Sequence, residues 1–118
     1  MSIDNPLNEA IRRLEVETDR NYPVELDFPF LSTIQLSNSI PDGYTINTEN
    51  FDQEISAFNG DFQYIQKAEK INGETMLVWS LLVNKIFFTG TEINEYQSFV
   101  KKLLSASSNV AVIRKLNN

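Results

Sequence analysis

The sequence predicts a mainly β domain: an antiparallel β-sandwich with one C-terminal helix followed by a last strand. The prediction rests on two Asn-Gly dipeptides set between strand-like runs, on alternating apolar residues upstream of them, and on helical spacing after Gly90. The same pattern allows one alternative, an α+β fold in which the helix packs on one face of an antiparallel sheet. At 118 residues the chain has the size of one domain with one core.

The dipeptides Asn59-Gly60 and Asn72-Gly73 are typical of type I′ turns, because both central residues of that turn need a positive φ. β-branched and aromatic residues surround them and predict a three-stranded antiparallel meander from about Phe51 to Phe88. Within it, residues Met76 to Val83 are apolar on both strand faces. Such a strand is expected at the centre of a sheet, with both of its faces covered.

Upstream, apolar residues alternate with polar ones from Val24 to Leu36 and predict a strand pair. The pair ends at the turn Pro41-Asp42-Gly43-Tyr44, after which another strand begins. Pro23 and Pro29 cannot donate ladder hydrogen bonds, so the first strand is expected to lie at a sheet edge or to be bent.

After Gly90, apolar residues recur every three or four positions and predict an amphipathic helix. Thr91 is expected to cap its start, and residues Ser105 to Asn109 are expected to end it. Residues Val110 to Ile113 then predict a final strand that returns to the sheet. The apolar face of the helix consists of Ile93, Tyr96, Val100 and Leu103, with Phe99 and Leu104 beside them.

The first residues of the chain are polar and allow either a helix after Asn5-Pro6 or a strand at Leu14 to Val16. We interpret residues 1–19 as a tether or linker from an upstream region, and residues 20–118 as the single β-sandwich domain. No apolar run is long enough to span a bilayer, so we expect no membrane insertion.

The composition argues against several classes of function. The chain has no cysteine and no histidine, which excludes Ser-His-Asp and Cys-His constellations, a structural zinc site and disulfides within it. Its formal charge of −6 argues against nucleic-acid binding. We therefore expect that the chain is not an enzyme, needs no cofactor, and has no catalytic, cofactor-binding or metal-binding residues.

Carboxylates and aromatic rings are the remaining candidates for a site. Acids near turns are mostly solvated, and nothing in the sequence brings two of them together for glycosidic chemistry or for calcium. The aromatic residues suggest a glycan- or peptide-binding module as the alternative function. Core packing nevertheless explains Trp79 and the tyrosines, and Lys85 is expected to reach solvent from a strand end. These candidates are Asp42, Asp52, Glu54 and Asp61 among the acids, and Tyr22, Tyr44, Tyr64 and Tyr96 among the tyrosines.

Charge is distributed unevenly along the chain. No basic residue lies between Arg20 and Lys67, and no acidic residue follows Glu95. The first interpretation is a solvated acidic surface with a basic C-terminal region. The alternative is an electrostatic contact with a neighbouring domain.

Four stretches, taken in order, resemble a known architecture. They are similar to the C-terminal domain, of unknown function, of transglutaminase-like proteins common in Bacteroides-type bacteria. In that family an Arg-x-x-Pro-Val segment precedes a Leu-Pro-x-Gly-Tyr turn, several strands and a helix with Glu-Tyr; here Ile40 replaces the usual Leu. The stretches are Asp19 to Phe30, Ile40 to Tyr44, Glu95-Tyr96, and Val112 to Lys115, so that the resemblance covers nearly the whole chain from Arg20 onward.

The resemblance implies an accessory β-sandwich of a secreted parent protein, with a periplasmic or extracellular location. In such proteins a papain-like core with a Cys-His-Asp triad precedes this domain. No catalytic residue carries over, because the chain has neither Cys nor His. The implied partner is the upstream domain of the same polypeptide, and a protein or glycan ligand is the alternative.

Overall fold

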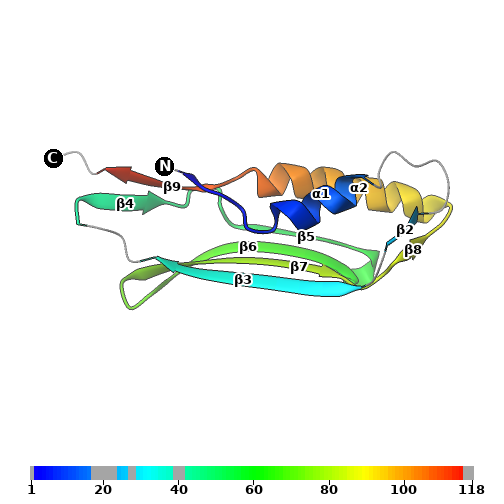
Figure 1. The fold of residues 1–118 in the computed structure, drawn as a ribbon, viewed down its shortest axis with the longest axis horizontal. Helices are drawn as coiled ribbons and strands as arrows, with labels where there is room; N and C mark the ends of the chain where they lie inside the picture. The colour runs from blue at the N-terminus through cyan, green and yellow to red at the C-terminus, as the bar shows by residue number, and fades with distance from the viewer. Residues whose placement is uncertain (1, 17–23, 27–28, 39–41, 116–118) are drawn as a thin grey trace.

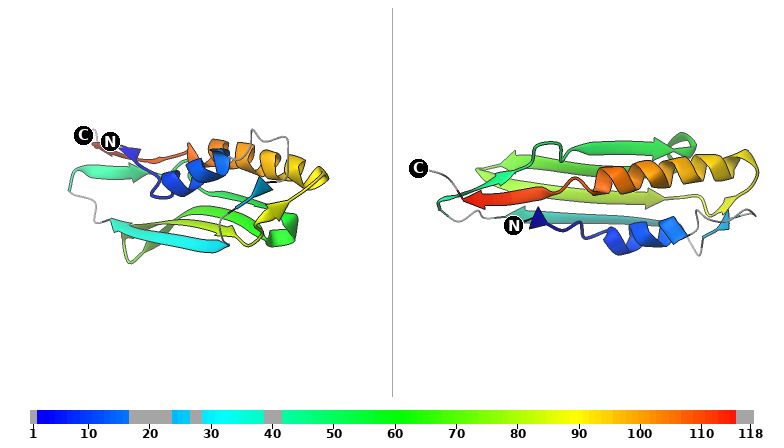
Figure 2. Two further views of the ribbon diagram at one scale, coloured as in Figure 1. Left: turned by 45° about the vertical axis from the view of Figure 1, so that its right-hand side comes forward. Right: turned by 90° about the horizontal axis from the view of Figure 1, so that it is seen from above.

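The computed structural model describes residues 2–16, 24–26, 29–38 and 42–115. The molecule is elongated, 57 × 23 × 20 Å, and is built in two layers (Figures 1 and 2). A long antiparallel sheet forms one layer, and two helices with a second sheet form the other. The predicted mainly β, antiparallel fold with a C-terminal helix and a last strand is confirmed, and the helices pack on one face of the sheet.

The long sheet has four strands in the order β3-β7-β6-β5. The predicted meander is confirmed as its last three strands in sequence, and the predicted central position of residues 76–83 is confirmed by β7. β3 pairs with β7 over nine consecutive residues, from Phe30 opposite Val83 to Asn38 opposite Thr75. The strands are β3 (Phe30–Asn38), β5 (Gln53–Ala57), β6 (Phe62–Ile71) and β7 (Glu74–Val83).

The two Asn-Gly dipeptides form different turns. Asn72 and Gly73, at φ 52° and 80°, make the predicted two-residue turn between β6 and β7. The β5–β6 connection is longer, because the short 3₁₀ helix η2 (Phe58–Gly60) and Asp61 separate the two strands. The prediction of a two-residue turn at Asn59-Gly60 was therefore wrong, because the connection is longer. Phe58 belongs to this connection, and its ring centroid lies 5.2 Å from that of Phe62 and 5.1 Å from that of Phe88.

The second layer combines sheet and helix. Its three-stranded sheet has the order β1-β9-β4, so the final strand pairs with β4 and β1 and not with the meander. A two-stranded ribbon, β2-β8, lies at the other end of the molecule. The elements are β1 (Ser2–Ile3), α1 (Asn8–Val16), β2 (Val24–Glu25), β4 (Tyr44–Asn47), β8 (Phe87–Phe88), α2 (Thr91–Ser107) and β9 (Ala111–Lys115).

The N-terminal residues belong to this packed structure. Leu7, Ile11 and Leu14 are buried in the core, and Ser2 and Ile3 pair with β9. The tether interpretation of residues 1–19 was therefore wrong for residues 2–16. These three apolar residues are few in a highly charged segment, but their spacing of four and three places them on one helix face. The opposite layer, which the local sequence does not reveal, supplies the burial.

Helix α2 follows the predicted pattern closely. It ends at Ser107, inside the predicted range, and its buried face includes Tyr96 and Phe99. The cap at Thr91 was wrong: the N-cap residue is Gly90, at φ 58°, and it makes no side-chain cap bond. The Glu92 carboxylate instead accepts a hydrogen bond of 3.3 Å from the Thr89 N–H. Within the described residues, no helix combines the length and apolar character that crossing a membrane requires.

Burial alternates along β7. Its odd-numbered residues from Thr75 to Val83 are buried beneath the helices, and its even-numbered residues from Met76 to Leu82 are half-buried. The prediction that both faces of β7 are covered was therefore wrong, because the described elements cover only one of them (Figure 1). Neighbouring side chains on β3 and β6 give the uncovered apolar residues their partial burial.

Candidate functional site

Asp52 and Glu54 are the two predicted acids that the fold brings together. Together with Lys67, they line a shallow surface depression of about 350 Å³ over β5 and β6. Asp52 Oδ1 accepts a hydrogen bond of 2.9 Å from the backbone N–H of Ala68. Asp42 and Asp61 do not line this depression. The Asp52 carboxylate is thus already used to satisfy a backbone donor just beyond the end of the β5–β6 pairing.

Lys67 supplies the positive charge of this depression. Its ammonium lies 2.8 Å from Glu69. Hydrogen bonding to Glu69 raises the Lys67 pKa, with further electrostatic contributions from Glu69, Asp52 and Glu54. Across the described ranges, no three acidic side chains gather closely enough to hold a metal ion. The depression is therefore an acidic surface cluster in which one lysine only partly offsets the charge of the carboxylates.

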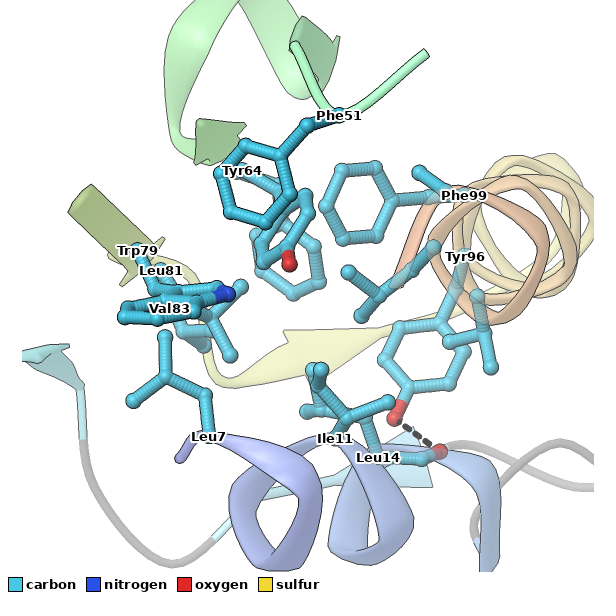
Figure 3. Close-up of a cluster of buried hydrophobic side chains, with 14 of the residues drawn as sticks. Leu7, Ile11, Leu14, Phe51, Tyr64, Trp79, Leu81, Val83, Tyr96 and Phe99 are labelled. Atoms are coloured by element: carbon cyan, nitrogen blue, oxygen red, sulfur yellow. Dashed lines mark hydrogen bonds between the residues drawn. The ribbon is translucent and has the colours of Figure 1, made fainter. Parts of the chain in front are cut away.

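The aromatic candidates lie mostly in the core. Trp79, Tyr64 and Tyr96 are buried, as predicted (Figure 3). Tyr44 is 43% exposed, and Tyr22 lies outside the described residues. Stacking on a sugar ring needs an exposed aromatic face, and among the described tyrosines and tryptophan only Tyr44 offers one.

A buried hydrogen-bond chain connects three segments of the fold through Asn5, Tyr64 and Gln66. The Asn5 Nδ2 donates to the Tyr64 hydroxyl at 2.7 Å, and that hydroxyl donates to Gln66 Oε1 at 2.5 Å. The Gln66 Nε2 donates to the carbonyl oxygens of Phe51 and Asn109 at 2.8 and 2.6 Å. Both hydrogens of the Gln66 amide are therefore used, and the chain joins the N-terminal segment to the β4–β5 loop and to the α2–β9 junction.

Burial sets the protonation state of Tyr64 in this chain of hydrogen bonds. Loss of solvent raises the pKa of Tyr64 to about 12, and the hydrogen bond from Asn5 opposes the shift by a smaller amount. Tyr64 is therefore a neutral phenol at physiological pH, able to donate and accept at once. The Asn5 Oδ1 also accepts from the Leu7 N–H at 2.8 Å, which satisfies a donor just before α1.

The two helices are joined by a second buried bond. The Tyr96 hydroxyl donates to the Leu14 carbonyl oxygen at 2.8 Å (Figure 3). Leu14 lies in the last turn of α1, where carbonyls have no partner within the helix. The tyrosine on α2 thus satisfies an end of α1 that the helix itself cannot.

A polar and aromatic cluster lies at the start of α2. The Lys85 ammonium lies 2.9 Å from Glu92 and between 5.6 and 5.8 Å from the ring centroids of Phe88 and Phe58. Hydrogen bonds from Lys85 and the Thr89 N–H lower the Glu92 pKa. Lys85 was predicted only to reach solvent from a strand end. Its ammonium also forms an ion pair with Glu92 and cation–π contacts with the rings of Phe58 and Phe88.

Glu95 holds the η2 turn. Its Oε2 accepts a hydrogen bond of 2.6 Å from the backbone N–H of Phe58, whose φ of 55° is unusual for a bulky residue. In the sequence, Glu95 stands out only as the last acidic residue and as part of the Glu95-Tyr96 stretch. The separation of 37 positions between the two residues hides this contact from local patterns.

The uncovered side of the long sheet is the remaining surface feature, here called the outer sheet face. Leu31 on β3 is 65% exposed on it. The Thr33 and Ser80 hydroxyls form a cross-strand hydrogen bond of 3.1 Å on the same face. Its apolar members are Leu31, Ile65, Ile71, Met76, Val78 and Leu82.

The structure is that of a small domain in which two helices cover one face of the long sheet. Its buried polar side chains form hydrogen bonds with other segments of the same chain. The chain belongs to the family described as a domain of unknown function with solved structure, DUF3858, which it matches over residues 2–113. No curated protein matches it.

A solved structure described as that of a "putative protease" from Parabacteroides distasonis ATCC 8503 has the same fold. The TM-score is 0.65 and the sequence identity 17%, over 84% of this chain. The chain spans only 19% of the length of that protein. At this identity the likeness shows the fold alone.

Proposed function

We propose that this chain is a non-enzymatic accessory or interaction domain that packs its outer sheet face against an upstream domain of a longer polypeptide. The observation that carries the proposal is the one-sided layering of the sheet. A sheet in a soluble domain is usually stabilised by burying its apolar residues, and here Val78 and Leu82 stay only half-buried beside an exposed Leu31.

The comparisons support a role inside a larger protein. The similar fold from Parabacteroides distasonis is about a fifth of its chain, and that protein is described as a "putative protease". The resemblance to the C-terminal domains of transglutaminase-like proteins suggests a papain-like core as the upstream partner, in a secreted or periplasmic parent. The chemistry would then belong to that core.

The internal arrangement of polar groups favours a non-enzymatic role. The polar side-chain atoms of Tyr64 and Gln66 form hydrogen bonds within the protein, and the Asp52 carboxylate accepts a hydrogen bond from a backbone N–H. A catalytic acid or base needs a polar atom directed at a substrate position. The buried groups here are directed at one another.

The test is binding between this chain and the remainder of the polypeptide that contains it. Val78→Lys places a charge at the centre of the outer sheet face, and Asn94→Lys adds the same charge on the exposed surface of α2 as a matched control. We expect the unmodified chain and the control to bind, and Val78→Lys to bind at least tenfold more weakly, by calorimetry.

Two results would overturn the proposal. One is no association of the unmodified chain with the remainder. The other is hydrolytic or transfer activity of the isolated chain that is lost in Asp52→Asn or Glu54→Gln. Circular dichroism of each variant establishes that it is folded before binding is compared.

A further inference from the structure

The two edges of the long sheet are protected to different degrees. β5, at one edge, is five residues long and contacts α2. β3, at the other edge, is nine residues long, and from Leu31 to Ser37 its backbone pairs with β7 alone in the described part of the chain. Alternate N–H and C=O groups of these residues therefore point away from the sheet without a partner strand.

β3 lacks the features that usually keep an edge strand from pairing. Residues 30–38 contain no charged residue, no proline and no glycine. The nine pairs with β7 run one to one, so no bulge twists the strand away. None of the residues 30–37 is buried, and Leu36 is 39% exposed. Long, regular and uncharged edges of this kind add further strands readily.

Charge separates the two edges as well. Acidic residues gather around β5 and its flanking loops, at Glu49, Asp52, Glu54 and Asp61. Helix α1 lies on the β3 side of the sheet (Figure 2). It carries Glu9, Arg12, Arg13 and Glu15, whose charges sum to zero. The local charge at β5 therefore opposes the approach of a second copy, whereas the charges that α1 carries beside β3 sum to zero.

We propose that two copies of this chain pair antiparallel through β3 and join their sheets into one of eight strands. A second copy supplies a strand of the same length that is also uncharged. A two-fold axis perpendicular to the sheet at Ile34 gives full overlap, because Ile34 is the central residue of β3. Residue 31 then lies opposite residue 37 of the copy, and Thr33 opposite Gln35. About eight to ten backbone hydrogen bonds form across the new junction, because alternate residue pairs of an antiparallel ladder exchange two bonds each.

The register allows a charge test specific to this arrangement. Thr33→Lys combined with Gln35→Lys places lysines opposite each other at both sides of the axis, so the pair should separate. Thr33→Glu combined with Gln35→Lys carries charges at the same two positions but places Glu opposite Lys, and should retain the pair. Ser56→Lys, exposed on β5, is the matched control at the other edge.

The measurement is the mass in solution by sedimentation equilibrium over a concentration series. We expect twice 13.5 kDa for the unmodified chain, for Ser56→Lys and for the Glu-Lys variant, and 13.5 kDa for the Lys-Lys variant. Circular dichroism checks that the Lys-Lys variant is folded.

Two outcomes overturn the proposal: an unmodified chain that stays monomeric up to roughly 100 μM, or a dimer that survives the Lys-Lys change. Failure of self-pairing can be distinguished from failure of the proposed function. Docking is measured as binding of the upstream domain, whereas self-pairing is measured as the mass of the chain alone.

Discussion

The Asn5 side chain donates a hydrogen bond of 2.7 Å to the hydroxyl of Tyr64, which is 59 positions away in the chain. This contact fixes the N-terminal segment against the long sheet, and Tyr64 extends it through Gln66 to two backbone carbonyls. All three side chains are buried. Because buried polar groups are costly to leave without partners, the chain of bonds should tolerate substitution poorly.

Asn5→Ala should lower the free energy of unfolding by about 1 to 3 kcal/mol, because it leaves the Leu7 N–H and one side of the Tyr64 hydroxyl unsatisfied. Urea denaturation followed by circular dichroism measures the loss. Asn94→Ala, at an exposed position on α2, is the control and should change stability by about 0.5 kcal/mol or less. Equal stabilities of the two variants would contradict the structural role of Asn5.

Ile11→Ala should cost about 2 to 5 kcal/mol, because it opens a cavity beneath α1 in the core. Arg12→Ala, one position along and exposed, should be nearly neutral. The same denaturation experiment compares them. If residues 2–16 were a loosely attached tether, neither substitution would affect unfolding.

Tyr64 should make stability fall at high pH. Below about pH 10 the phenol is protonated in both states. Above it the unfolded chain ionises while the folded chain keeps its proton until about pH 12, so stability is lost across that window by about 2 to 3 kcal/mol.

Absorbance at the phenolate band, measured as unmodified chain minus Tyr64→Phe, should therefore show a midpoint near 12. The subtraction removes the signals of the other tyrosines. A difference titration centred near 10, the value of a solvated phenol, would show that Tyr64 is not buried in solution.

Glu95→Ala should destabilise the fold by about 1 kcal/mol, because the Phe58 N–H loses its acceptor in a turn with an unfavourable φ. Glu95→Gln keeps an acceptor oxygen and should cost less. Thermal unfolding of both variants measures the difference. An equal loss for Gln and Ala would mean that charge near the start of α2, and not the bond to Phe58, is the source of the effect.

Local patterns predicted much of the fold. The Asn72-Gly73 turn, the central place of β7 and the buried face of α2 depend on residues close together in sequence, whose spacing reports the strand or helix period directly. The same patterns gave the burial of Trp79 and Tyr64. They missed the Glu95–Phe58 bond and the Asn5–Tyr64–Gln66 chain, since polar residues carry no periodic signal for a distant partner.

The sequence by itself determined the meander strands, helix α2 and the absence of cysteine and histidine chemistry, because turn preference, apolar period and composition are local properties. Tertiary structure decided which surfaces are covered. Among the described residues, it buried α1, left one face of β7 without a covering layer, and placed β3 at a sheet edge beside α1 and β5 at an acidic edge. Burial depends on what a distant segment brings against a residue, and only the folded chain contains that information.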